Sequence, residues 1–199
     1  MTKITSGSRA LDKETINKII FSCKTYEERL FLLIGFELGM RRSDIVKIRV
    51  SDINLDDGTI TYTEKKKKNK TRVLPISESL KSELKRYFNK FALHGDCYLF
   101  PNREKSSSTG YISSKTAYNI FNRACHRIGL NTPIPMNVMR SSCVKSKLAC
   151  GWTIEQVSAL IGDEPSTVIE HYATDGLPTP DFNELKMLMM ENGPGHGYI

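Results

Sequence analysis

Between residues 137 and 172 the sequence predicts three short helices in close succession, and this segment constrains the fold more than any other. The first helix carries Arg140 near its start, the second begins with a capping box at Thr153 and runs to Leu160, and the third ends near Tyr172. The sequence around Arg140 is typical of a buried position. A buried arginine, followed by a lone tyrosine on a short helix in a basic protein, indicates chemistry on a phosphate group.

The overall charge favours the same class of partner. The chain has 29 basic and 22 acidic residues, a net charge of +7, which favours a polyanion, and nucleic acid is the commonest polyanion. No apolar run approaches a membrane span and the first residues lack the apolar core of a signal peptide, so we expect a cytoplasmic protein without a membrane partner. The five cysteines and four histidines lack the spacing of a disulfide framework or a zinc site, so no metal is expected.

A second arginine follows two predicted helices near the N-terminus. Apolar residues at helical spacing predict one helix after an Asp12 cap and another that Gly39 closes. Arg41 comes directly after this apolar segment, so the base of its side chain is expected to be buried and to need an anionic partner. Asp44, three residues on, is the candidate brace. Alternatively, one of the adjacent arginines, Arg41 and Arg42, caps the carbonyls of the preceding helix and the other is solvated; this explains the two arginines equally well.

A basic hairpin is predicted after this junction. Residues 59–63 and 72–76 favour β-strands, and a run of lysines lies between them. Such a run is usually a solvated loop whose charges repel one another. The functional alternative is a finger placed against phosphates, in which a lysine donates a proton to a leaving oxygen.

These elements predict an α+β fold that is mainly α-helical, with a small antiparallel sheet whose β-hairpin carries the lysines. We expect residues 1–10 to be flexible, 11–176 to form one domain, 177–192 to add a C-terminal helix that docks on its own domain or on a neighbouring subunit, and 193–199 to be a disordered tail. A helix over residues 113–129 turns Arg123 and Arg127 outward, either toward a nucleic-acid backbone or simply toward solvent.

The order of these features resembles the catalytic domain of the tyrosine recombinases, the phage-integrase and Xer family, over about residues 10–175. Residues 39–45, Gly-Met-Arg-Arg-Ser-Asp-Ile, resemble the first arginine box, in which Arg41 is the family arginine and Asp44 its acidic neighbour. Residues 67–75 resemble the lysine hairpin. There the resemblance assigns the catalytic lysine to Lys67, with Lys66, Lys68 and Lys70 as close rivals.

The remaining two boxes lie in the C-terminal part of the chain. Residues 137–140 occupy the His-x-x-Arg box, with Arg140 as the second arginine, and residues 160–163 occupy the Leu-Gly-His box. Tyr172 follows Asp163 by nine residues, the family spacing to the nucleophile. Two positions depart from the family: Asn137 and Asp163 replace the histidine and the His or Trp.

These departures affect the expected chemistry. Asn137 can hydrogen-bond a phosphate oxygen but cannot act as an acid or base near neutral pH. Asp163 could orient Arg41, Arg140 or Tyr172, although an anion beside a phosphate is unfavourable unless an arginine offsets it. His171, next to the nucleophile, is a candidate replacement for the lost imidazole.

The resemblance implies a site-specific DNA recombinase or integrase that needs neither metal, ATP nor any other cofactor. Tyr172 would attack a DNA phosphate to give a 3′-phosphotyrosine, the two arginines would stabilise the transition state, and Lys67 would protonate the departing oxygen. The implied partners are double-stranded DNA and further copies of the chain, as a tetramer on DNA. The expected DNA contacts are Arg42, Lys65, Lys66, Lys68, Lys70, Arg72, Arg123 and Arg127.

Three functions remain open. The family usually has a separate N-terminal core-binding domain, and we expect none here, so a clamp around DNA would be missing or come from another chain. The favoured function is an active recombinase. The alternatives are a recombinase-fold DNA-binding protein that has lost turnover, suggested by Asn137 and Asp163, and a type IB-like enzyme that nicks and closes DNA.

Overall fold

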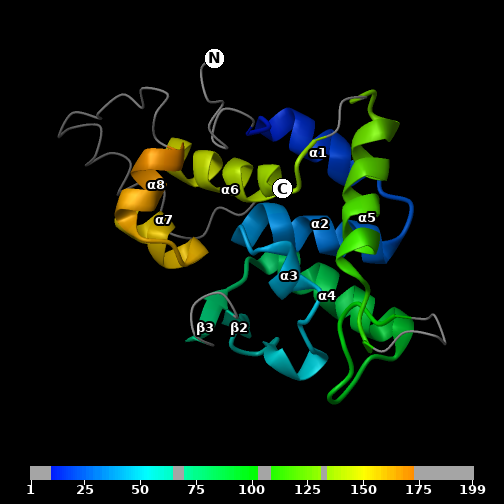
Figure 1. Cartoon of the computed structure of the whole chain (residues 1–199). Coiled ribbons are helices and arrows are strands. Elements are labelled where there is room, and N and C mark those ends of the chain that lie inside the picture. Colours follow the sequence, from blue (N-terminus) through cyan, green and yellow to red (C-terminus); the bar gives the residue numbers. More distant parts are fainter. Residues whose placement is uncertain (1–9, 65–69, 103–108, 131–133, 173–199) are drawn as a thin grey trace.

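The chain folds into helices around one core, with a small sheet at its edge (Figure 1). The computed structural model describes residues 10–64, 70–102, 109–130 and 134–172. This mainly helical architecture confirms the predicted fold class. Its elements are α1 (Lys13–Phe21), α2 (Tyr26–Leu38), α3 (Arg42–Ile45), the 3-10 helix η2 (Val50–Asp52), β1 (Ile53–Asn54), β2 (Thr59–Glu64), β3 (Lys70–Pro75), α4 (Glu78–Phe91), α5 (Ser114–Arg127), α6 (Asn137–Ala149), α7 (Ile154–Ile161) and α8 (Pro165–Tyr172).

Local sequence signals account for most helix ends. The Asp12 side chain accepts a hydrogen bond from the Thr15 amide, which confirms the predicted cap of α1. Thr153 forms the predicted capping box at the start of α7. Gly39 ends α2 in the left-handed conformation, with φ of 60°, and so turns the chain sharply into α3.

One helix end and one strand depend on details that the sequence patterns do not predict. Helix α4 ends at Phe91, because Ala92 adopts a left-handed φ of 48° and the Leu93 amide donates to the Phe88 carbonyl at 3.0 Å. The sheet has a third, very short strand: β1 pairs antiparallel with β2, and residues 55–58 close the turn between them. Two residues are too few to show an alternating pattern in the sequence.

The sheet has the order β1-β2-β3 and is antiparallel throughout. Successive side chains of a strand point to opposite faces. In β2 the alternate residues Ile60, Tyr62 and Glu64 are buried, so this face turns toward the helices. On the same face of the hairpin formed by β2 and β3, Arg72 pairs with Tyr62 and Leu74 pairs with Ile60.

Helix α2 runs through the centre of the core, and α6 packs along it. Gly35 permits this close approach, because a Cβ at that position would lie 2.7 Å from the Met139 sulfur.

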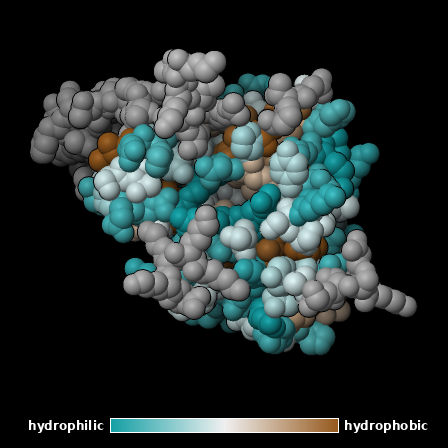
Figure 2. All heavy atoms as spheres, viewed as in Figure 1, coloured by the Kyte–Doolittle hydropathy of each residue, from teal (hydrophilic) through white to brown (hydrophobic). Residues whose placement is uncertain are grey.

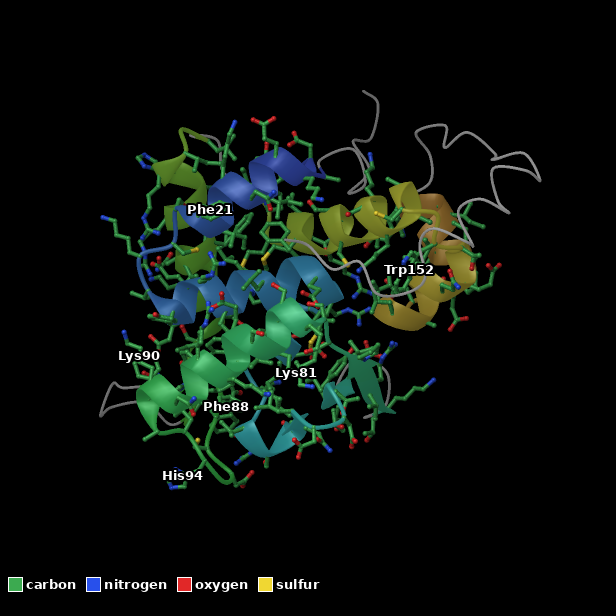
Figure 3. The ribbon with its side chains drawn as sticks, turned by 180° about the vertical axis from the view of Figure 1, so that it is seen from behind. Phe21, Lys81, Phe88, Lys90, His94 and Trp152 are labelled. Carbon is green, nitrogen blue, oxygen red and sulfur yellow. The ribbon has the colours of Figure 1, made fainter. Side chains whose placement is uncertain are left out.

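In Figure 1, α7 and α8 lie together at one end of the molecule, with β2 and β3 below them. Figure 3, seen from behind, shows Phe21, Lys90 and His94 on the side away from Trp152, which lies between α6 and α7.

The face of the molecule in Figure 2 is mostly hydrophilic, with only small hydrophobic patches among the coloured atoms. No helix in the described ranges combines the length and the apolar character that crossing a membrane requires.

Candidate active site

Arg41 lies at the turn between α2 and α3. The left-handed turn at Gly39 directs the chain so that Arg41 becomes the N-cap residue of α3. Its side chain is 22% exposed, and its guanidinium donates from Nη1 to Glu64 Oε1 and from Nη2 to Asp163 Oδ1, each at 2.7 Å. Charged hydrogen bonds on both Nη atoms fix the plane of the guanidinium group.

Arg140 lies in the first turns of α6 and is almost fully buried, at 4% exposed. Its Nη1 donates to the Gly39 carbonyl oxygen at 2.8 Å and its Nη2 to Asp163 Oδ2 at 2.6 Å. Burial opposes the charge on this guanidinium, but the hydrogen bond to Asp163 and the charge of that carboxylate outweigh it, so the pKa of Arg140 is raised.

Asp163 therefore joins the two arginines. Its two carboxylate oxygens each accept from a different guanidinium, although Arg41 is 122 residues away in the sequence and Arg140 is 23. The carboxylate follows the left-handed Gly162, which ends α7 with φ of 75°. We refer to Arg41 and Arg140 below as the arginine pair.

Tyr172, the last residue of α8, lies against the same cluster. Its phenol is close to the Arg140 guanidinium, and the interaction between the two groups contributes to the raised pKa of Arg140. Tyr172 is 6% exposed and packs in the hydrophobic core. The neighbouring His171 ring lies 6.4 Å from the Tyr172 ring, centroid to centroid, edge to face.

Asp44, the brace expected for Arg41, has a different neighbour. Its buried carboxylate accepts from the Ser43 hydroxyl at 3.3 Å, while Glu64 and Asp163 form the ion pairs with Arg41. Burial raises the pKa of Asp44, against the opposing effect of the nearby Arg41.

Glu64 is not among the site residues predicted from the sequence. A signal was present: Glu64 ends a strand whose alternate residues, Ile60 and Tyr62, are apolar, so the alternation places a carboxylate on the buried face.

The other candidate residues are spread more widely. Lys65, Lys66, Lys67 and Lys68 lie outside the described residues, whereas Lys70 is exposed at the start of β3. Asn137 is exposed as the first residue of α6. Arg42 is partly buried, and its Nη1 lies 3.5 Å from the Met136 sulfur.

Besides Arg42, three of the expected DNA contacts bind oxygen atoms of the protein. Arg72 donates to the carbonyls of Ala159 and Leu160, and Arg127 binds both carboxylate oxygens of Glu28 at 2.7 and 3.1 Å. Arg123 also reaches Glu28, at 3.3 Å. Contacts of these arginines with DNA stay a prediction.

The cluster suits an anion better than a cation. The described part of the chain contains no group of three or more His, Cys, Asp or Glu side chains placed to hold a metal ion, and all five cysteines are free thiols. The arginine pair instead provides convergent N–H donors, the arrangement that binds phosphate or carboxylate.

The model of the phage integrase family matches residues 9–176. The chain belongs to the phage integrase family. Tyrosine recombinase XerA of Pyrococcus horikoshii is 25% identical over 154 residues, which are 77% of this chain and 52% of that protein.

Solved structures of recombinases share the fold of this family member. The crystal structure of XerA recombinase has a TM-score of 0.71 at 15% identity and covers 94% of this chain and 66% of that one. XerH bound to its difH substrate before cleavage has a TM-score of 0.71 at 19% identity, with 96% and 57% covered. The chain spans about half the length of the curated relatives it matches.

Proposed function

We propose that this integrase-family chain is the catalytic part of a site-specific DNA recombinase that cuts and rejoins strands through a 3′-phosphotyrosine. The observation that carries the proposal is the convergence of Arg41 and Arg140 on a single carboxylate, with the Tyr172 phenol close to Arg140. Membership of the integrase family supports recombination in general. The DNA-bound state of structural relatives such as XerH supports duplex DNA as the substrate.

The arginine pair stabilises the transition state in this proposal. A phosphodiester presents two non-bridging oxygens, as the Asp163 carboxylate does, and each guanidinium can donate to one of them. When Tyr172 attacks phosphorus, negative charge builds up on those oxygens in the pentavalent transition state, where fixed cationic donors stabilise it most. The described contacts of Arg41 and Arg140 hold both groups before substrate arrives.

The bond changes balance without a cofactor. The Tyr172 oxygen forms a bond to phosphorus, the bond from phosphorus to the 5′ oxygen breaks, and Lys67 or a neighbouring lysine of the hairpin protonates that oxygen. The phenol proton passes to solvent, the lysine later regains its proton from solvent, and Arg140 stabilises the negative charge that develops on the phenol oxygen. Rejoining reverses these steps with a 5′-hydroxyl from the same or a second duplex. Asn137, exposed at the start of α6, donates to a phosphate oxygen.

A second candidate is a recombinase-fold DNA-binding protein without turnover. Two observations favour it: Asp163 already occupies the donors that a phosphate needs, and Tyr172 is only 6% exposed. In the active enzyme, DNA binding must therefore displace the carboxylate from part of the arginine pair and move α8 enough to bring the phenol to phosphorus.

Trapping on nicked DNA separates these candidates. We expect incubation with a randomised pool of nicked duplexes to give a protein–DNA adduct that survives SDS, because the short cut fragment diffuses away and prevents religation. Tyr172→Phe should abolish the adduct, at least 1,000-fold below the parent, since it removes the nucleophile. Tyr26→Phe, at a 41%-exposed position on α2, is the matched control.

The adduct also makes it possible to identify the DNA target sequence and the type of reaction. Sequencing the attached strands defines the target site, and a paired-duplex assay with that site distinguishes strand exchange from simple relaxation. Absence of any adduct with the parent protein, under conditions where it binds duplex DNA, would favour the binding-only candidate.

A further inference from the structure

We propose that Glu64 is a positioning residue for strand cleavage, which holds Arg41 in place beside Asp163 without touching DNA itself. The proposal rests on the function proposed above and goes beyond it by assigning a role to a buried group outside the family boxes. Glu64 Oε1 accepts from Arg41 Nη1 at 2.7 Å, opposite the hydrogen bond from Nη2 to Asp163.

The burial of Glu64 is poorly explained by stability. Its side chain is 1% exposed, and among the described residues its Oε2 has no hydrogen-bond partner; the Arg72 Nη1 atom lies 3.8 Å away in a loose ion pair. A buried carboxylate with one unsatisfied oxygen carries a desolvation cost, and buried ion pairs rarely give more stability than apolar side chains of similar volume. The advantage of a carboxylate at this position is the orientation of Arg41.

The strand fixes where this carboxylate lies. Glu64 is the last residue of β2, on the same buried face as Ile60 and Tyr62, and it pairs with Lys70 across the hairpin. The lysine run of residues 65–68 follows it directly in the sequence. Glu64 therefore connects two parts of the proposed active site: Arg41, and the strand β2 that leads into the lysine run.

Arg72 completes the link from the hairpin to the other side of the site. It lies diagonally across the hairpin from Glu64, and its Nη2 donates to the carbonyls of Ala159 and Leu160 in the last turn of α7. These carbonyls lack partners within the helix, so the guanidinium satisfies them. Asp163 is the second residue after the end of α7. The hairpin thus supports Arg41 directly and Asp163 through α7.

For the reaction, these contacts fix the plane of the Arg41 guanidinium group. With Glu64 and Asp163 on its two Nη atoms, Arg41 cannot rotate about its terminal bonds without losing a charged hydrogen bond. Without Glu64, the substrate phosphate would meet a guanidinium held by Asp163 alone, and DNA binding displaces part of that contact. We expect Glu64 to matter most in the transition state, when charge on the phosphate oxygens is greatest.

The test uses the full chain and the target site recovered with nicked duplexes. At saturating DNA, we expect single-turnover adduct formation to slow about 10-fold in Glu64→Gln, which keeps an acceptor oxygen but loses the charge, and about 100-fold in Glu64→Ala. DNA affinity, measured by fluorescence anisotropy, should change less than about 3-fold, because Glu64 does not contact DNA. Glu83→Gln, which weakens another carboxylate–arginine contact, with Arg29 on α2, should cleave at the parent rate.

The outcomes separate this inference from the proposed function. The positioning role would be overturned if both Glu64 variants cleaved at the parental rate. It would also be overturned if their rates fell only in proportion to the folded fraction, measured by circular dichroism in the same samples. Either result would leave the recombinase proposal standing. A parent protein that forms no adduct would overturn both. The graded order of parent, Gln and Ala, with unchanged affinity, supports the positioning role.

Discussion

At Asp163, one carboxylate holds two guanidinium groups that the sequence places far apart. The anion balances charges that would otherwise repel one another in a buried setting, and it gives Arg140, at 4% exposed, its charged hydrogen bond. The same carboxylate occupies the donors that a phosphate needs. An aspartate at this position therefore organises the arginine pair in the free protein and competes with the substrate.

Asp163→Asn should lower the free energy of unfolding by about 3 kcal/mol, because it removes the negative charge that bonds both members of the arginine pair while keeping the shape of the side chain. Inorganic phosphate should restore part of this loss by binding between the guanidiniums, and should stabilise the parent protein less. Urea unfolding with and without phosphate measures both effects.

Asp96→Asn is the control for the prediction at Asp163. It removes a carboxylate, 74% exposed, from an ion pair with Arg49, and should cost less than about 1 kcal/mol, with no added effect of phosphate. Equal losses in the two variants would show that the buried contacts of Asp163 contribute no more than an exposed pair.

At the level of elements, the end of α7 is the point where the hairpin and the arginine pair meet. Gly162 ends the helix with φ of 75°, and Arg72 and Glu64 pack directly against it. Only a residue without a Cβ allows the backbone to turn here and the two side chains to approach. The position of Asp163 thus depends on a glycine that has no chemical role.

Gly162→Ala should lower the free energy of unfolding by more than the left-handed backbone conformation at residue 162 alone explains. The new Cβ would collide with Arg72 Nη1 and lie 2.9 Å from Glu64 Oε1. Gly129→Ala is the matched control, because Gly129 also follows a helix, α5, at a φ of 84°, and nothing lies within 4 Å of its Cβ position. We expect a loss of about 1 kcal/mol at Gly129, from left-handed strain, and about 3 kcal/mol at Gly162.

Thermal or urea unfolding of the two glycine variants checks this difference. Losses of the same size at both positions would mean that Arg72 and Glu64 move aside freely, and that the contact between the hairpin and α7 is loose.

Across the whole molecule, buried carboxylates respond to pH in opposite directions. Burial raises the pKa of Glu37, although its contacts with Ser77 and the charge of Lys147 oppose the shift. Burial has the same effect at Glu28, but the hydrogen bond from Arg127 and the other contacts outweigh it and lower the pKa of that carboxyl. The Glu37 carboxyl joins α2 to the start of α4, and the Glu28 carboxyl joins α2 to α5.

The signs of the resulting pH dependence differ. A carboxyl whose folded pKa is raised favours the folded state at low pH, and this contribution is lost as pH rises through the unfolded and then the folded value. Glu37→Gln should therefore gain stability relative to the parent as pH rises above 4.5, by at most about 1.4 kcal/mol per pH unit. The Gln oxygen still accepts from the Ser77 amide, so the geometry is kept.

Glu28→Gln should behave in the opposite way. Its lowered pKa stabilises the folded state above the unfolded value of 4.5, and this contribution is lost as pH falls, so the variant should be less stable than the parent at neutral pH and approach it in acid. Urea unfolding from about pH 2.5 to pH 8 covers the expected changes in both variants. Parallel stability curves for Glu37→Gln and the parent would contradict the raised pKa.

Much of the fold follows from local sequence. The caps at Asp12 and Thr153, the left-handed stop at Gly39 and the alternation in β2 predict these elements because each depends on contacts within a few residues. The order of the arginine boxes and the spacing from Asp163 to Tyr172 predict the family, which the match over residues 9–176 confirms.

Only the tertiary structure decided which charges meet. Asp163 lies 122 residues from Arg41, Glu64 reaches the same guanidinium from a strand, and Glu28 binds Arg127, for which the sequence leaves DNA or solvent open as partner. Periodicity places a side chain on a face, but the partner on that face depends on how separate elements pack, and this is set by the burial of the whole core. The sequence by itself therefore determined which groups the site can contain, and the packing of α2, α6, α7 and the hairpin determined how they are joined.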